Sequence, residues 1–191
     1  MKLHSASVNE TDAQVALNYL KEGNERFVSN KCMPRDTNKA DLELTKSEQK
    51  PFAAILTCAD SRVSPEIFFD QKIGDIFVVR NAGNMADRSA LGSIEFAVKH
   101  LKAAIVVVVG HTQCGAVHTS YSGATGLSHN LQAVLDDIKP IVSGASDAEA
   151  GVVTNAKKQA ESIKNNPVIK ECGAPVYAAT YDVASGKVNF L

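Results

Sequence analysis

The sequence predicts an α/β domain built on a central, mostly parallel β-sheet of about four strands with flanking helices. Three short, almost wholly apolar segments are typical of strands buried on both faces, and they lie at 52–57, 76–79 and 103–109. Amphipathic stretches lie between and after them, at 64–70, 89–102, 129–142 and 147–165. This alternation of apolar strands and amphipathic helices is the pattern of a parallel α/β sheet.

The two ends of the chain add elements to this core. Near the N-terminus, apolar residues recur at helical spacing at Ala13, Leu17, Leu20 and Phe27. Asn9 is a candidate N-terminal cap for this helix. We expect residues 1–48 to form a helical arm that packs on a partner subunit. At the other end, two apolar segments flank "VASG" and predict a C-terminal strand or hairpin extension. With 191 residues, 45% of them apolar, we expect a single domain over residues 1–191.

Composition limits the classes of partner. The 20 basic and 21 acidic residues nearly balance, so a net charge of -1 gives no reason to expect nucleic acid or an anionic membrane. The first residues are polar, without the apolar region of a secretory signal, and the run at 103–109 is too short to span a bilayer. We therefore expect a cytoplasmic protein, in which four cysteines indicate metal binding or burial rather than disulfides.

Cysteine and histidine residues follow two of the predicted strands. Cys58 comes directly after the first apolar segment, and the third is followed by His111 and Cys114 as an H-x-x-C pair. If these strands are neighbours, their carboxyl ends meet and the three side chains can converge on one point. Two thiolates and one imidazole suit zinc, and three protein ligands leave its fourth position open, as in catalytic sites.

Asp60 and Arg62 lie beside this candidate metal site. Residues two apart in an extended segment point to the same side, so the two side chains can pair. Arginine keeps the carboxylate ionised, and an ionised carboxylate only accepts hydrogen bonds, so Asp60 could orient a zinc-bound hydroxide. The alternative is a structural ion pair at a strand end. A cysteine phosphatase is excluded, because the position six residues after Cys58 is Ser64 rather than arginine.

Four motifs are similar, in order and spacing, to those of the β-class carbonic anhydrases: "CADSRV", "RNAGN", "SIEFAV" and "GHTQCGAV". The similarity runs from about Gln49 to Val117. The resemblance implies an enzyme with one Zn²⁺ per chain that interconverts carbon dioxide and bicarbonate through a zinc-bound hydroxide. It also implies a four-stranded, mostly parallel sheet. The assembly it implies is a homodimer or homotetramer with its sites at the subunit interface.

The resemblance also implies roles for individual residues. The zinc ligands would be Cys58, His111 and Cys114, and the catalytic pair Asp60 and Arg62. Substrate contacts would come from Gln49, reaching over from a partner subunit, and from Phe77, Ala82, Gly83 and Phe96, with His100 as a candidate proton shuttle. In some members the aspartate becomes a fourth zinc ligand and closes the site. The absence of tryptophan favours an open site here, with Asp60 off the metal.

Two other functions remain open at this stage. A carbonyl sulfide or carbon disulfide hydrolase would keep the same scaffold and metal and differ in the electrophile. A non-catalytic zinc-binding regulatory module would need only the metal ligands. The presence of both Asp60 and Arg62 argues against that module, because metal binding alone requires neither.

Overall fold

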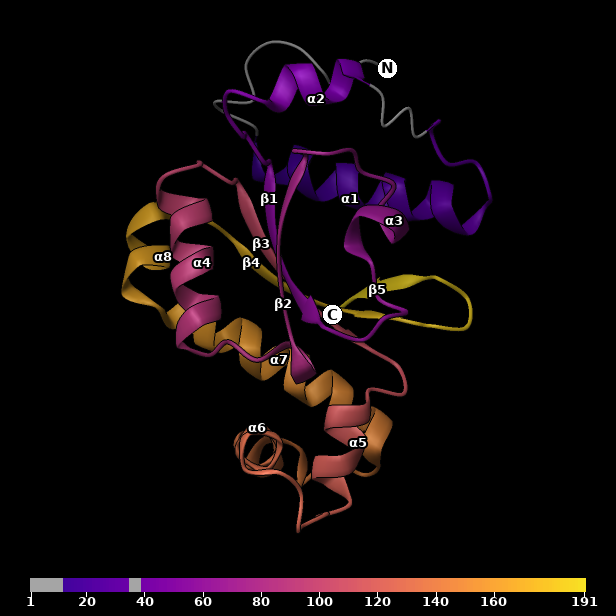
Figure 1. Ribbon diagram of the computed structural model, residues 1–191, viewed down its shortest axis with the longest axis vertical. Helices are drawn as coiled ribbons and strands as arrows, with labels where there is room; N and C mark the ends of the chain where they lie inside the picture. The colour runs from indigo at the N-terminus through magenta and orange to yellow at the C-terminus, as the bar shows by residue number, and fades with distance from the viewer. Residues whose placement is uncertain (1–11, 35–38) are drawn as a thin grey trace.

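The computed structural model describes residues 12–34 and 39–191, and its core is one five-stranded sheet (Figure 1). The strand order is β2-β1-β3-β4-β5. The strands are β1 Ala53–Cys58, β2 Ile76–Asn81, β3 Ile105–His111, β4 Val176–Tyr181 and β5 Val188–Phe190. The first four in this order are parallel and β5 is antiparallel to β4. The predicted parallel α/β sheet and its C-terminal hairpin are therefore confirmed.

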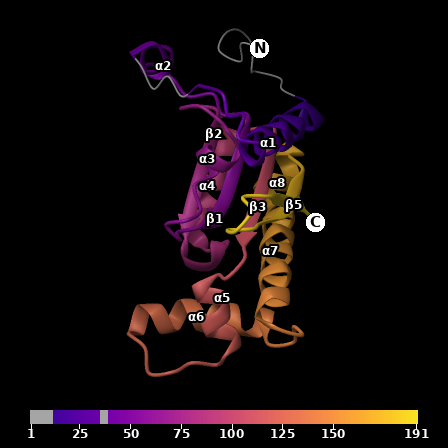
Figure 2. The same ribbon diagram turned by 90° about the vertical axis from the view of Figure 1, so that its right-hand side faces the viewer.

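Helices cover both faces of the sheet. One face carries α1 (Ala13–Val28) and α3 (Pro65–Phe68). The other face carries α4 (Arg88–Lys99), α7 (Ala148–Asn165) and α8 (Pro167–Cys172). Beyond the sheet lie α5 (Gly115–Tyr121) and α6 (His129–Val142) at one end and α2 (Lys39–Thr45), which stands away from the body, at the other (Figure 2). The arrangement is a three-layer sandwich with an appendage at each end.

Burial on both faces explains the continuous apolar strands. Successive side chains of a strand point to opposite faces, so Ile55 packs in the cluster beneath α1 whereas Leu56 packs in the cluster beneath α4. All six residues of β1 and all seven of β3 are buried. A strand with two buried faces cannot alternate apolar and polar residues, and this is why β1 and β3 read as uninterrupted apolar runs. The same prediction was wrong for 76–79, because β2 lies at the edge of the sheet and Phe77–Val79 are only half-buried.

The N-terminal helix begins where its cap lies. Asp12 precedes α1, and its side chain accepts a 2.7 Å hydrogen bond from the Gln14 backbone amide. Asn9, the cap suggested by the sequence, lies outside the described residues. Leu17 and Leu20 are buried against the chain's own sheet, so α1 is part of this chain's core.

Two helices escaped the sequence prediction. The seven residues of α5 and the six residues of α8 are too short to show a helical period. Local capping defines α8: Asn166 accepts a 2.9 Å hydrogen bond from the Val168 backbone amide, and Pro167 occupies the first turn.

The sheet topology brings the carboxyl ends of β1 and β3 together. The two strands are paired in parallel, with Thr57 opposite Val109, and Cys58 is opposite Asn81 of β2. We call this the carboxyl end of the sheet, and the end where these strands begin the amino end. Over residues 12–34 and 39–191, no helix has both the length and the apolar character needed to cross a bilayer.

Candidate active site

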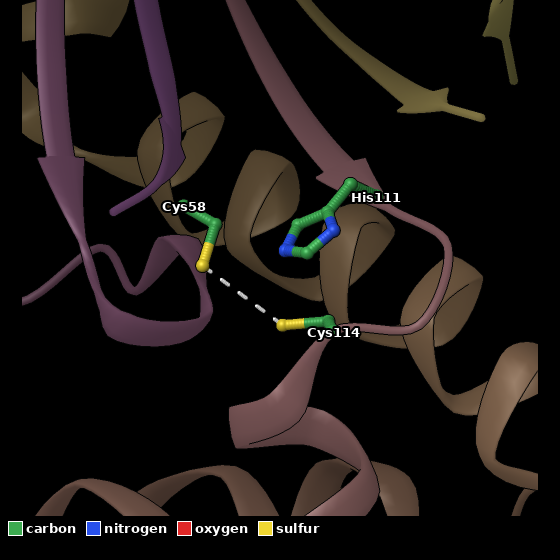
Figure 3. Close-up of side chains that lie close together, drawn as sticks. All are labelled: Cys58, His111 and Cys114. Atoms are coloured by element: carbon green, nitrogen blue, oxygen red, sulfur yellow. Dashed lines mark hydrogen bonds between the residues drawn. The ribbon is translucent and has the colours of Figure 1, made fainter. Parts of the chain in front are cut away.

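Three buried side chains meet at the carboxyl end of the sheet. Cys58 ends β1, His111 ends β3, and Cys114 immediately precedes α5. Their potential ligand atoms all lie within 4.8 Å of one another, and the two Sγ atoms are 4.0 Å apart. Figure 3 shows the thiols and the imidazole turned toward a common point. Cys58 thus lies beside two residues that follow it by 53 and 56 positions in the sequence, as predicted.

The donor atoms of this cluster fit a zinc ion. His111 Nδ1 donates to the Thr112 carbonyl oxygen at 3.0 Å, which leaves a lone pair on Nε2. His111 is 0% exposed, and among the described residues Nε2 has no hydrogen-bond partner. A buried nitrogen lone pair without a partner is costly unless a metal or a donor occupies the space it faces. Two sulfurs and one imidazole nitrogen are zinc's preferred ligands, so these residues can hold this metal.

The two thiols are unequal. The Cys58 and Cys114 sulfurs share one hydrogen bond, and this contact with Cys114 is the main cause that lowers the pKa of Cys58. The shared hydrogen and burial raise the pKa of Cys114. Cys58 is therefore the thiol of the pair that ionises first, and its negative charge lies where a cation would be bound.

Asp60 and Arg62 form a close ion pair beside the cluster. Arg62 Nη2 lies 2.7 Å from Asp60 Oδ2, and Arg62 Nε lies 2.9 Å from Asp60 Oδ1. These charged donors hold the pKa of Asp60 well below its usual range, and the carboxylate raises the pKa of Arg62. Asp60 Oδ2 is 3.9 Å from His111 Nε2. An ionised, acceptor-only carboxylate therefore stands next to the candidate metal position.

The short 3-10 helix η2 (Ala82–Asn84) closes the other side of the cluster. Ala82 is half-buried and Gly83 is buried. The Gly83 backbone has φ +71° and accepts a 2.8 Å hydrogen bond from Asn155 Nδ2 through its carbonyl oxygen. Glycine is required here because a side chain rarely adopts this φ.

Replacing Gly83 with Ala should destabilise the protein by about 1–3 kcal/mol and loosen the cluster. A Cβ at this position would lie 2.5 Å from Ile138 Cδ1 and 3.4 Å from Ala116 Cβ. Gly92 is the matched control, because it lies in α4 and a methyl group there would meet no neighbouring atom within 4 Å. Gly92→Ala should gain up to about 1 kcal/mol from helix propensity. Denaturant unfolding of both variants checks this, and equal stability of the two would contradict it.

The sequence from residue 53 to 188 matches the family model described as carbonic anhydrase. The chain belongs to the β-carbonic anhydrase family. Carbonic anhydrase 2 of Mycobacterium tuberculosis is 47% identical over 110 residues, which cover 58% of this chain and 53% of that protein. The chain thus spans about half the length of this curated relative. The carbonic anhydrase of Pseudomonas aeruginosa is 29% identical over 180 residues, which cover 82% of both chains.

Solved structures agree with this family membership. The β-carbonic anhydrase CafA of Aspergillus fumigatus superposes with a TM-score of 0.73 at 28% identity, covering 93% of this chain and 89% of that one. The Coccomyxa β-carbonic anhydrase, solved in complex with acetazolamide, has a TM-score of 0.73 at 25% identity, covering 92% and 86%. The β-carbonic anhydrase fold therefore extends over nearly the whole chain.

Four other predicted site residues lie at the amino end of the sheet. Gln49 is exposed and precedes β1, which alone extends about 17 Å to Cys58. Phe77 is the second residue of β2, opposite Ala54. Phe96 and His100 lie at the end of α4 that leads back toward the start of β3. The structure does not bring these four residues to the metal cluster of their own chain.

Three of these side chains form a ring cluster of their own. The ring centroids of Phe77 and Phe96 are 6.5 Å apart, and those of Phe96 and His100 are 5.4 Å apart. Phe96 is 46% exposed, and Phe77 is half-buried. This aromatic patch is therefore a surface of the described chain.

Sequence reasoning missed three residues that hold the site in place. Arg80 donates to two backbone carbonyls of the Cys58–Asp60 segment. Asn155 and Gln159 lie one turn apart on α7, are buried, and are joined by a 3.1 Å hydrogen bond. Gln159 Oε1 accepts from the Ala86 amide at 2.9 Å, so α7 secures the loop that contains Gly83. The sequence signal that could have identified Asn155 and Gln159 is two polar residues, four positions apart, on the apolar face of a helix.

Proposed function

We propose that this protein is a zinc-dependent carbonic anhydrase, a carbonate dehydratase, which catalyses the reversible hydration of carbon dioxide to bicarbonate and a proton. One zinc ion per chain would be held by Cys58, His111 and Cys114. The observation that carries the proposal is the convergence of these three buried ligands with an ionised carboxylate 3.9 Å from His111 Nε2. Family membership supports the same reaction.

When bound, zinc supplies Lewis acidity that makes hydroxide available as a nucleophile near neutral pH. The Asp60 carboxylate can only accept hydrogen bonds, so it would accept one from the O–H group of the nucleophile. The oxygen lone pair of the nucleophile would then be directed away from Asp60. Arg62 keeps that carboxylate ionised and fixed. Both Asp60 oxygens already accept hydrogen bonds from Arg62, which supports an open site with Asp60 off the metal.

We infer that substrate contacts come from a second copy of the chain. Carbon dioxide offers little to a hydrogen bond, so an apolar wall must hold it, and Phe77 with Phe96 forms such a surface at the amino end. Gln49, exposed at the same end, would donate to the substrate oxygen that gains negative charge. Ala82 and Gly83 would line the pocket on the metal side.

A symmetric assembly would bring the residues at the amino end of one chain to the metal site at the carboxyl end of another. In a homodimer, or in a homotetramer built from such dimers, the amino end of one chain would complete the metal site of its partner. In the N-terminal arm, α1 packs in its own chain, whereas Leu42 and Leu44 of α2 are 54% and 56% exposed. We therefore propose that α2 is the part of the arm that packs on the partner subunit.

His100 is our candidate for the group that exports the proton, because imidazole exchanges protons near neutral pH. Its ring is exposed beside Phe96, so in the proposed dimer it would serve the partner's site. His100→Ala should slow turnover in weak buffer, and added imidazole should restore it. His129, exposed at the start of α6, gives a matched control that should change nothing. Unchanged turnover of His100→Ala in weak buffer would remove His100 from the mechanism.

The experiment that tests the proposed function compares two electrophiles. Stopped-flow hydration of carbon dioxide and release of sulfide from carbonyl sulfide are measured on the same zinc-loaded protein. We expect fast hydration and little sulfide release. Sulfide release without hydration would support a carbonyl sulfide or carbon disulfide hydrolase. One zinc per chain with neither activity would support a regulatory zinc module.

The remaining expectations about partners and location rest on charge and thiol chemistry. A net charge of -1 gives no electrostatic drive toward nucleic acid or anionic membranes, and we propose neither as a partner. Zinc binding requires Cys58 and Cys114 to remain reduced, which the cytoplasm favours. We therefore propose a cytoplasmic enzyme.

A further inference from the structure

One exposed arginine, Arg80, donates hydrogen bonds to the backbone between Cys58 and Asp60. Arg80 lies on β2 opposite Thr57. Its Nε donates to the Cys58 carbonyl oxygen at 3.1 Å, and its Nη2 donates to the Asp60 carbonyl oxygen at 2.7 Å. A single guanidinium therefore holds the backbone on both sides of Ala59, between a proposed zinc ligand and the proposed orienting carboxylate.

These contacts occur where the sheet stops supporting the chain. The last pair of β1 with β3 is Thr57 with Val109, and the Ala59 amide still donates to the Asn81 carbonyl of β2 at 2.9 Å. Beyond that point the chain turns away, closed by a 3.0 Å hydrogen bond from the Val63 amide to the Asp60 carbonyl. Arg80 thus acts in the segment between the end of the strand and this turn, where the backbone would otherwise gain freedom.

The geometry of arginine matters for this role. Its guanidinium is planar and rigid, and Nε–H and Nη2–H on one edge can serve two acceptors at a fixed separation. Lysine has the same charge, but its ammonium is a compact point on a flexible stem. It could reach one carbonyl without fixing its distance from the other. Because Arg80 is exposed and the core clusters lie elsewhere, its removal should leave the core intact.

We propose that Arg80 is a positioning residue. The two N–H donors on one edge of its guanidinium, which we call the fork, fix the Cys58 thiol relative to the Asp60 carboxylate. The role in catalysis rests on the proposed function, whereas the role in metal binding does not. Loss of the fork should let Cys58 and Asp60 move independently, so both zinc retention and alignment of the nucleophile should suffer. Residues that hold a metal ligand in place typically contribute 10- to 100-fold to affinity or activity, roughly the effect expected here.

The test compares Arg80→Ala and Arg80→Lys, with Arg88→Ala as a control for loss of an exposed arginine on α4. Three quantities are measured: the zinc dissociation constant, the visible absorption of the Co²⁺-substituted protein, and kcat and KM for carbon dioxide. For Arg80→Ala we expect roughly 10- to 100-fold weaker zinc binding, a changed Co²⁺ spectrum, and a fall in kcat rather than a rise in KM. Arg80→Lys should recover only part of these losses, and Arg88→Ala should match the wild type.

Wild-type zinc affinity and kcat in Arg80→Ala would overturn the proposal. Full recovery in Arg80→Lys would also overturn it, because charge rather than the fork would then suffice. If Arg80→Ala does not fold, Arg80→Lys decides alone. Zinc affinity and the Co²⁺ spectrum test Arg80 even if the wild-type protein hydrates no carbon dioxide, so failure of the proposed function is seen separately.

Discussion

Replacing Cys58 with Ser should remove stoichiometric zinc and lower carbon dioxide hydration more than about 100-fold, because a lost ligand should cost more than a lost supporting contact. The serine hydroxyl is a poor zinc ligand, and its oxygen cannot match the thiolate that Cys58 readily forms. The remaining His111 and Cys114 would leave the metal with two protein ligands. Zinc analysis after dialysis and stopped-flow hydration measure the two losses together.

Cys172→Ser is the matched control for this substitution. Cys172 is exposed at the end of α8, so its thiol can be replaced without touching the cluster. We expect the zinc content and the activity of this variant to equal those of the wild type. A Cys58→Ser protein that still holds one zinc per chain would show that the metal site lies elsewhere.

Asp60→Asn should lower kcat by about 100-fold or more while leaving zinc content unchanged. The amide has nearly the same shape as the carboxylate, but it carries no charge and offers one acceptor oxygen instead of two. The side chain would lose its charged hydrogen bonds with Arg62 and could turn a donor toward the nucleophile. Hydration kinetics and metal analysis on one preparation separate these effects.

The control for Asp60→Asn is Asp137→Asn, which removes the charge of an exposed aspartate on α6. It should leave both readouts unchanged. If Asp60→Asn keeps full activity, Asp60 is a structural partner of Arg62 and does not orient the nucleophile. If it loses zinc together with activity, Asp60 contributes to metal binding and the open-site assignment is wrong.

The metal cluster could be predicted from sequence because residue type and strand position both point to it. Cys58 and His111 each end a continuous apolar segment, and parallel neighbours bring such ends together. The resemblance implied Phe77, Phe96 and His100 as site residues, but it did not predict that their rings form one cluster at the amino end of the sheet. The position of this cluster depends on strand register and on the direction of α4, which periodicity alone does not give.

Contacts to the backbone were beyond the sequence prediction for a different reason. Arg80 and Asn155 act on carbonyl oxygens, which every residue possesses, so no second residue type marks the interaction. The start of α1 shows a similar ambiguity, since Asn9 and Asp12 are equally good caps by type. The structure identifies Asp12 because its side chain accepts from the Gln14 amide.

The proposed substrate contacts depend on the inference that each site combines the carboxyl end of one chain with the amino end of another. Mixed dimers of Cys58→Ser and Gln49→Ala chains, purified by two different tags, test it directly. Each homodimer should be nearly inactive, since Gln49→Ala removes a donor whose loss is expected to cost about 100-fold. The mixed dimer has one site with neither substitution, formed by Cys58 of one chain and Gln49 of the other. We predict about half the wild-type activity per dimer, because a symmetric dimer has two equivalent sites. Activity equal to the mean of the two homodimers would contradict a site shared between chains.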